Sequence, residues 1–155
     1  MIKKFSILAA SLISVAVIGT AVARESENPA VKARKAVMQL YAFNLGTLGG
    51  MAKGEVEYNA EAATRAANNL VAVTQIDQSA MWPAGSDNVS DPSSRALPAI
   101  WENFPDVSAK GQAMAEAAVA MQAAAGQDVE ALKAAMGPLG GACSACHKAY
   151  RAPKN

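Results

Sequence analysis

Four stretches of this sequence repeat apolar side chains at steps of three and four residues, the spacing that marks one face of an α-helix. They cover about residues 29–53, 59–80, 104–125 and 128–152. Alanine is abundant and aromatic residues make up only 5% of the chain, a composition that favours closely packed helices over sheets. The sequence therefore predicts an all-α fold, an antiparallel four-helix bundle with up-down-up-down connections.

The ends of these stretches carry residues that commonly cap helices. Asn28 followed by Pro29 indicates the start of the first helix, and Gly54 lies just beyond its expected end. Asp128 is a suitable cap for the start of the fourth helix. These signals support the predicted boundaries.

Helix-breaking residues interrupt the pattern in two places. Gly137 and Pro138 predict a bend or a break in the fourth helix. Residues 82–99 combine prolines with serines and aspartates, so we expect a long loop between the second and third helices. The side chains expected on the inward faces of the first three helices are Val31, Arg34, Met38, Tyr41, Leu45, Leu48, Ala63, Ala66, Ala67, Leu70, Val73, Ile76, Phe104, Val107, Met114, Ala118 and Met121.

The N-terminal segment, residues 1–23, has the pattern of a secretory signal peptide. Lys3 and Lys4 precede an apolar run, and small residues at Ala21 and Ala23 suit a cleavage site. A membrane anchor is the alternative, but the apolar run is short for a span of about 20 residues. We expect cleavage, export to a bacterial periplasm, and a mature domain of residues 24–155 without stable membrane insertion.

The chain has only two cysteines and one histidine, and all three lie in the run Cys143-Ser144-Ala145-Cys146-His147. The C-x-x-C-H pattern attaches haem c. On a helix, the cysteines at i and i+3 and the histidine at i+4 project from one face. The motif therefore predicts one haem c, bound covalently through Cys143 and Cys146, ligated by His147 and lying near one end of the bundle.

Three other interpretations of the motif are weaker. Cysteines one helical turn apart meet disulfide geometry poorly. A thioredoxin-like redox pair belongs to a βαβ setting and leaves His147 without a role. A structural zinc site normally needs four ligands, and the chain has only these three of the usual Cys and His type.

The second axial position of the iron is not defined by the motif. No methionine follows His147, and no second histidine exists. The position is therefore open, occupied by water or a small ligand, or filled by an upstream methionine or lysine. Distances along the helices of such a bundle leave Met38, Met81 and Met114 as methionine candidates.

Several runs of the chain resemble class II c-type cytochromes, the four-helix group that contains cytochrome c prime. The resemblance covers essentially the whole mature chain. Its most specific parts are the C-terminal haem motif and the Arg34-x-x-x-Met38 pattern. The runs that carry it are 31–38, 44–48, 52–55, 58–59, 99–101 and 132–151.

The resemblance implies roles for three further residues. Met38 stands where a low-spin branch of the family has its methionine ligand, whereas the high-spin branch has an apolar residue shielding an open distal site. Arg34 corresponds to an arginine that pairs with a haem propionate; an ordinary solvated arginine is the alternative. Arg151 lies one turn after His147, where it either tunes the iron from the proximal side or stabilises the helix C-terminus.

These observations predict a periplasmic electron carrier with a low-spin haem ligated by His147 and Met38. The alternative is a five-coordinate, high-spin cytochrome that binds nitric oxide or carbon monoxide. We do not expect an enzyme, because no distal histidine is available for peroxidase chemistry.

The net charge of +1 argues against nucleic-acid binding. The sequence does not identify redox partners. The resemblance implies homodimers through the first two helices. Gly46, Gly49 and Gly50 either allow close approach of two protomers there or pack inside the bundle.

Overall fold

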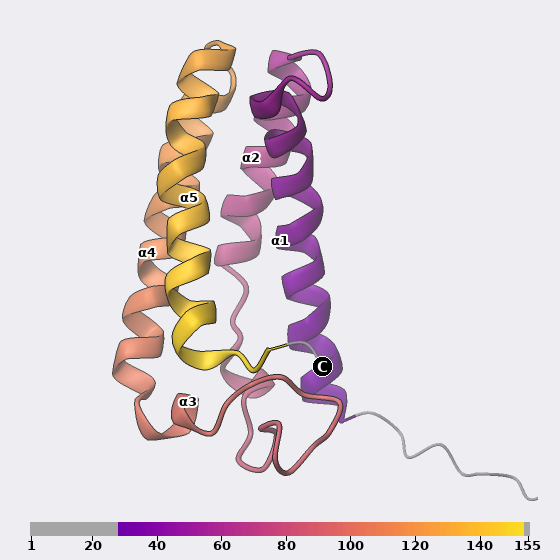
Figure 1. Cartoon of the computed structure of the whole chain (residues 1–155), viewed down its shortest axis with the longest axis vertical. Coiled ribbons are helices and arrows are strands. Elements are labelled where there is room, and N and C mark those ends of the chain that lie inside the picture. Colours follow the sequence, from indigo (N-terminus) through magenta and orange to yellow (C-terminus); the bar gives the residue numbers. More distant parts are fainter. Residues whose placement is uncertain (1–27, 154–155) are drawn as a thin grey trace, which may run out of the picture.

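The structure is a computed structural model that describes residues 28–153; the expected signal peptide, residues 1–23, lies outside this range. Four long helices run antiparallel, up-down-up-down, and each contacts the next, with α5 returning to α1 (Figure 1). The all-α, four-helix prediction is confirmed. The elements are α1 (Pro29–Lys53), α2 (Ala60–Thr74), η1 (Ser79–Met81), α3 (Ala99–Glu102), α4 (Phe104–Ala125) and α5 (Val129–Tyr150).

The predicted caps hold the ends of the helices. Asn28 Oδ1 accepts a hydrogen bond from Ala30 N at 2.9 Å, and Asp128 Oδ1 accepts one from Ala131 N at 2.8 Å. Gly54 ends α1 with φ 73°, a left-handed conformation that favours glycine. Local sequence therefore fixes where α1 and α5 start and where α1 stops.

The structure corrects three expectations. Helix α2 ends at Thr74 and not near residue 80; Asp77 Oδ1 accepts from Ser79 N, a local bond that competes with helix continuation, and Ile76 is 40% exposed. Phe104, at the start of α4, is 46% exposed and does not face the core. Helix α5 runs unbroken through the exposed Pro138, so the predicted break is wrong, while the bend stays a prediction.

The bundle has a main core and a smaller one. The main core fills the bundle between all four long helices; its fully buried large side chains are Leu48, Leu70, Met121, Leu132 and Leu139. The smaller core joins Ala96 and Ile100 to Tyr150 at the end of α5. It lies at the lower end of the bundle in Figure 1, where the long loop and the last residues of the chain meet.

Within residues 28–153, no helix has both the length and the apolar content needed to cross a membrane.

Candidate haem-binding site

Helix α5 carries the motif in its last two turns. Cys143, Cys146 and His147 are each half-buried, and neither cysteine is in a disulfide. Burial raises the pKa of both thiols. Cys143 faces the interior, where its Sγ lies 3.5 Å from Met114 Sδ, whereas Cys146 packs against the smaller core. The structure thus keeps both thiols protonated and available beside the single histidine.

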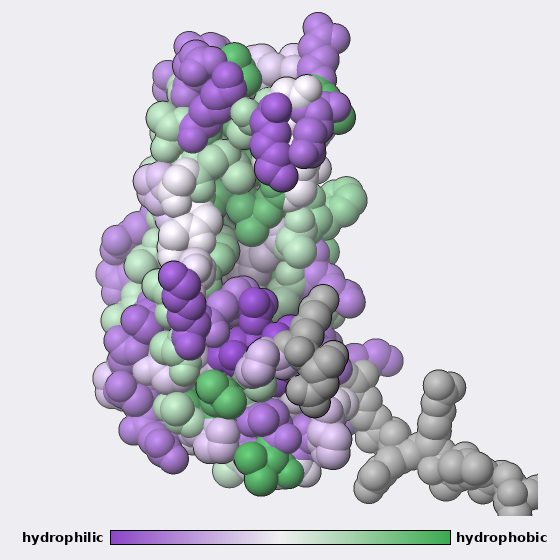
Figure 2. Space-filling view, in the orientation of Figure 1, coloured by the Kyte–Doolittle hydropathy of each residue, from purple (hydrophilic) through white to green (hydrophobic). Residues whose placement is uncertain are grey.

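A cavity of about 390 Å³ lies beside Cys143 and His147. Its wall includes three cationic side chains, those of Arg95, Lys148 and Arg151. None of the described residues that line it is an aspartate or a glutamate. Figure 2 shows a hydrophilic area on the lower half of this face, where the chain ends. The cavity therefore suits a group that carries negative charge.

The end of α5 is fixed by contacts with the long loop and with α4. Ala96 and Arg151 form an antiparallel bridge, and Leu97 N donates to Tyr150 O at 3.0 Å. The Tyr150 hydroxyl donates to Asp106 Oδ2 at 2.6 Å. Because Tyr150 follows the motif by less than one turn, these bonds also fix the position of the histidine.

The environment of His147 keeps its imidazole neutral. Burial lowers its pKa, and the positive charges of Arg151 and Arg95 lower it further. The neutral ring is the form that binds a metal ion. The same charges disfavour any added positive charge near the ring. They would therefore favour Fe(II) over Fe(III) in an iron bound there.

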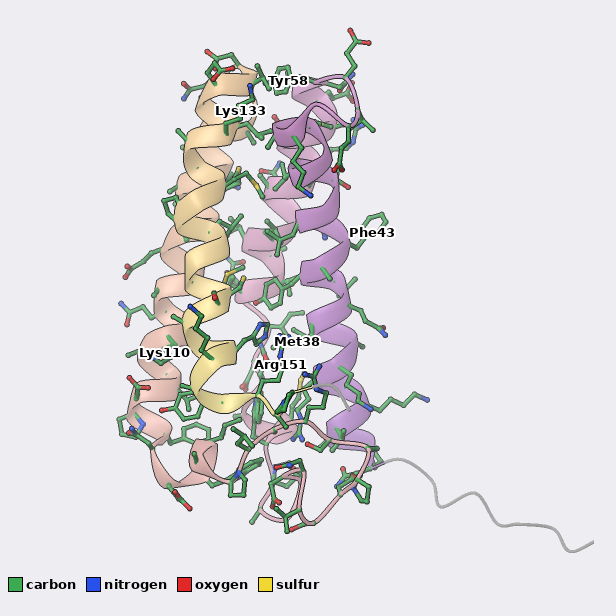
Figure 3. The ribbon with its side chains drawn as sticks, in the orientation of Figure 1. Met38, Phe43, Tyr58, Lys110, Lys133 and Arg151 are labelled. Carbon is green, nitrogen blue, oxygen red and sulfur yellow. The ribbon has the colours of Figure 1, made fainter. Side chains whose placement is uncertain are left out.

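The predicted distal residue lies across from this helix. Met38 lies on α1, a helix that contacts α5, and is 40% exposed (Figure 3). Met38 does not line the cavity that contains His147. Of the two other candidates, Met114 contacts Cys143, and Met81 lies in η1, where its carbonyl accepts from Arg34.

Arg34 is buried, with 5% of its surface exposed, and it binds the long loop. Its guanidinium donates to Met81 O at 3.2 Å, to Ser86 Oγ and Ser94 Oγ at 2.7 Å each, and to Ser86 O. Burial lowers its pKa. The solvated alternative for Arg34 is therefore wrong, while a propionate contact stays a prediction.

Two tryptophans contact the guanidinium of this arginine. The guanidinium carbon lies 4.7 Å from the ring centroid of Trp82 and 6.0 Å from that of Trp101. The rings meet edge to face, and Trp101 Nε1 donates to Trp82 O at 3.0 Å. Cation–π contacts of this kind replace part of the hydration that the guanidinium loses on burial.

Arg95 is a site residue that the sequence did not suggest. It lies in the loop, far from the motif along the chain, and reaches the cavity because its guanidinium donates to Ala152 O, with Nε at 2.9 Å. No spacing rule connects the two segments. Only the pairing of the loop with the last residues of the chain brings them together.

The residues present fit a covalently attached haem. Two unpaired thiols have the attachment spacing, a neutral imidazole follows them, and three cations line the neighbouring cavity. The two propionates of a haem would supply the negative charge that this cavity lacks. A four-helix bundle with such a site defines a helical c-type cytochrome.

Comparison with known proteins agrees with this class. A family model described as Cytochrome C' matches residues 29–151. A cytochrome c-554 of Cereibacter sphaeroides is 47% identical over 121 residues, which are 78% of this chain and 79% of the relative. The chain belongs to the cytochrome c' family, whose members carry one covalently attached haem c.

Solved structures show the same fold. A cytochrome c' from Rhodobacter sphaeroides is similar with a TM-score of 0.79 and 38% identity, covering 81% of this chain and 96% of that one. A second solved cytochrome c', described as having an unusual ligand-controlled dimer dissociation, gives a TM-score of 0.73 and 31% identity over 80% of this chain and 95% of that one.

Proposed function

We propose that this chain is an electron carrier in which Cys143 and Cys146 hold one haem and His147 and Met38 bind its iron. The observation that carries the proposal is the pair of free thiols one helical turn apart, directly before His147 and beside a cavity lined by three cations. Met38 is included because the Arg34-x-x-x-Met38 pattern resembles the low-spin branch of the family. The bound haem supplies an iron that changes between Fe(II) and Fe(III). A thioether from Met38 favours the reduced state. Positive charge from Arg95 and Arg151 beside His147 acts in the same direction.

The arginines complete the proposed site. Arg151, in contact with the cavity, holds a propionate or tunes the proximal side of the iron. Arg34 anchors the loop that in turn pairs with the end of α5. Four of the five N–H groups of the Arg34 guanidinium donate to the loop and η1, so Nε–H is the one left for a direct contact with a propionate.

An open distal site is the second candidate function. Two observations favour it: Met38 is partly exposed and does not share the cavity of His147, and one solved relative is described by its ligand-controlled dimer dissociation. In that case the protein would bind nitric oxide or carbon monoxide on a five-coordinate iron.

One experiment separates the two functions. We would record the absorption spectrum of the ferric holo-protein and add carbon monoxide to the ferrous form, for wild type and for Met38→Ala. A low-spin wild type that becomes high-spin in Met38→Ala supports the carrier. Met81→Leu and Met114→Leu serve as matched controls and should stay low-spin. A high-spin wild type that binds carbon monoxide readily at neutral pH would refute ligation by Met38.

The attachment residues have their own test. Replacing both Cys143 and Cys146 with serine should abolish covalent haem, so that denaturation in acidified organic solvent extracts all of it. Single replacements should leave one thioether and shift the band of the reduced pyridine haemochrome. Haem that stays on the double variant after denaturation would contradict the attachment.

We also propose that the protein is exported to the periplasm and forms homodimers. Export rests on the pattern of residues 1–23, and fusion of this segment to a reporter enzyme tests it.

The dimer rests on the outward face of α1, where Phe43 is 74% exposed and points away from the bundle (Figure 3). A Cβ at Gly46 would meet open space, whereas one at Gly49 or Gly50 would contact side chains of the bundle. Phe43→Asp should shift the mass measured by light scattering toward the monomer.

A further inference from the structure

The cations beside the cavity differ from four other basic side chains of the bundle, each of which pairs with a carboxylate. Within residues 28–153, none of Arg95, Lys148 and Arg151 forms an ion pair with a carboxylate; Arg95 donates only to a backbone carbonyl. Elsewhere, four cations pair with acids two, three or four residues away along the chain. Those pairs are Lys53–Glu55, Arg65–Glu61, Lys110–Asp106 and Lys133–Glu130.

The cofactor alone does not neutralise this group, which we call the basic rim (Arg95, Lys148 and Arg151). A haem brings two propionates, so at least one of the three positive charges remains. Lys148 and Arg151 are exposed, and the cavity opens to solvent between them and the loop. The rim therefore keeps a positive charge at the place where the attachment helix meets solvent, on a chain whose net charge is only +1.

We propose that the basic rim is the docking surface for a redox partner protein that presents an acidic patch around its own cofactor. This inference rests on the proposed function as an electron carrier. Unpaired cations around the opening would attract such a patch and orient it toward the haem edge. An anionic membrane fits less well, because lipid-binding clusters usually contain four to eight basic residues and the rim contains three.

The test measures electron transfer to the ferric holo-protein by stopped flow, with two reductants. Reduced flavodoxin serves as an acidic protein probe, and lumiflavin semiquinone as a small neutral one. For wild type, we expect the flavodoxin rate constant to fall about tenfold or more as ionic strength rises from about 10 to 300 mM, and the lumiflavin rate constant to change little.

Charge reversal at the rim provides the decisive comparison. Lys148→Glu should lower the ratio of the flavodoxin to the lumiflavin rate constant by about tenfold at low salt. The ratio removes any effect of a changed reduction potential, which is also measured directly. Lys133→Glu, on the same helix but at the opposite end of the bundle (Figure 3), is the matched control and should change the ratio by less than about twofold.

Any one of three results would overturn the inference. The first is a flavodoxin rate constant of wild type that does not depend on salt, and the second is a ratio that Lys133→Glu lowers as much as Lys148→Glu does. The third is sedimentation of the holo-protein with phosphatidylserine vesicles at physiological salt that Lys148→Glu abolishes. Failure of the proposed function looks different. In that case both reductants react slowly with wild type and the ferric spectrum is high-spin.

Discussion

Replacing Ser94 with alanine removes one acceptor from the buried guanidinium of Arg34. Ser94 Oγ lies 2.7 Å from Arg34 Nη2 and also accepts from Ala96 N at 3.1 Å. Both Arg34 and Ser94 are buried, so water does not readily replace the lost acceptor. Nη2 would keep the carbonyl of Ser86, while the amide of Ala96 would lose its partner. We therefore expect Ser94→Ala to destabilise the loop and the whole domain.

The two lost bonds set the magnitude. A hydrogen bond to a charged group contributes about 1.5–3 kcal/mol and a neutral one about 0.5–1.5 kcal/mol. Because the guanidinium keeps its other acceptors and the loop can adjust, we expect the free energy of unfolding to fall by about 2 kcal/mol. For a domain of this size, the Tm should fall by roughly 6 °C.

Urea denaturation of the holo-protein, followed by far-UV circular dichroism, measures this change at constant m-value. The neighbouring Ser93 offers a matched control, because its Oγ is buried without a hydrogen-bond partner among the described residues. Ser93→Ala should change the free energy of unfolding by less than about 0.5 kcal/mol.

A double-mutant cycle with Arg34→Met isolates the contact between the two side chains. We expect a coupling energy of about 1.5 kcal/mol or more between Arg34 and Ser94. The reasoning fails if Ser94→Ala is no more destabilising than Ser93→Ala, or if the effects of Ser94→Ala and Arg34→Met simply add.

Three further predictions concern the bundle itself. Gly54→Ala should cost about 1 kcal/mol because φ at this position is 73°, whereas Gly46→Ala, in the middle of α1 with open space around it, should stabilise by about 1 kcal/mol; urea midpoints at low protein concentration compare the two. Leu48→Ala should cost about 3 kcal/mol because Leu48 is fully buried in the main core, and a change below about 1 kcal/mol by the same measurement would contradict that packing. The hydrogen bond from Tyr150 lowers the pKa of Asp106, so the contribution of this carboxylate is complete above about pH 4 and is lost as pH falls through the lowered pKa. Asp106→Asn should therefore flatten the acid side of the plot of stability against pH, and an unchanged profile would count against the role of this bond.

The sequence by itself determined most of the bundle. Helix caps such as Asn28 and Asp128 act within three residues, and apolar spacing acts within one or two turns, so both can be read locally. The attachment motif is equally local, because Cys143, Cys146 and His147 occupy adjacent positions on one helix. The exceptions, such as the early end of α2 near Asp77, arise where a side chain offers the backbone an alternative hydrogen bond.

Only the tertiary structure decided how the site is surrounded. The burial of Arg34 beside Trp82 and Trp101 depends on the path of the long loop, which no periodicity describes. Arg95 reaches the cavity because residues 95–97 pair with residues 150–152, a contact between segments remote in sequence. The motif alone predicts the cofactor, because covalent attachment depends only on the spacing of the cysteines and the histidine within one helix. The positions of the cations beside the motif depend on packing between helices and loop, because they are set by long-range contacts.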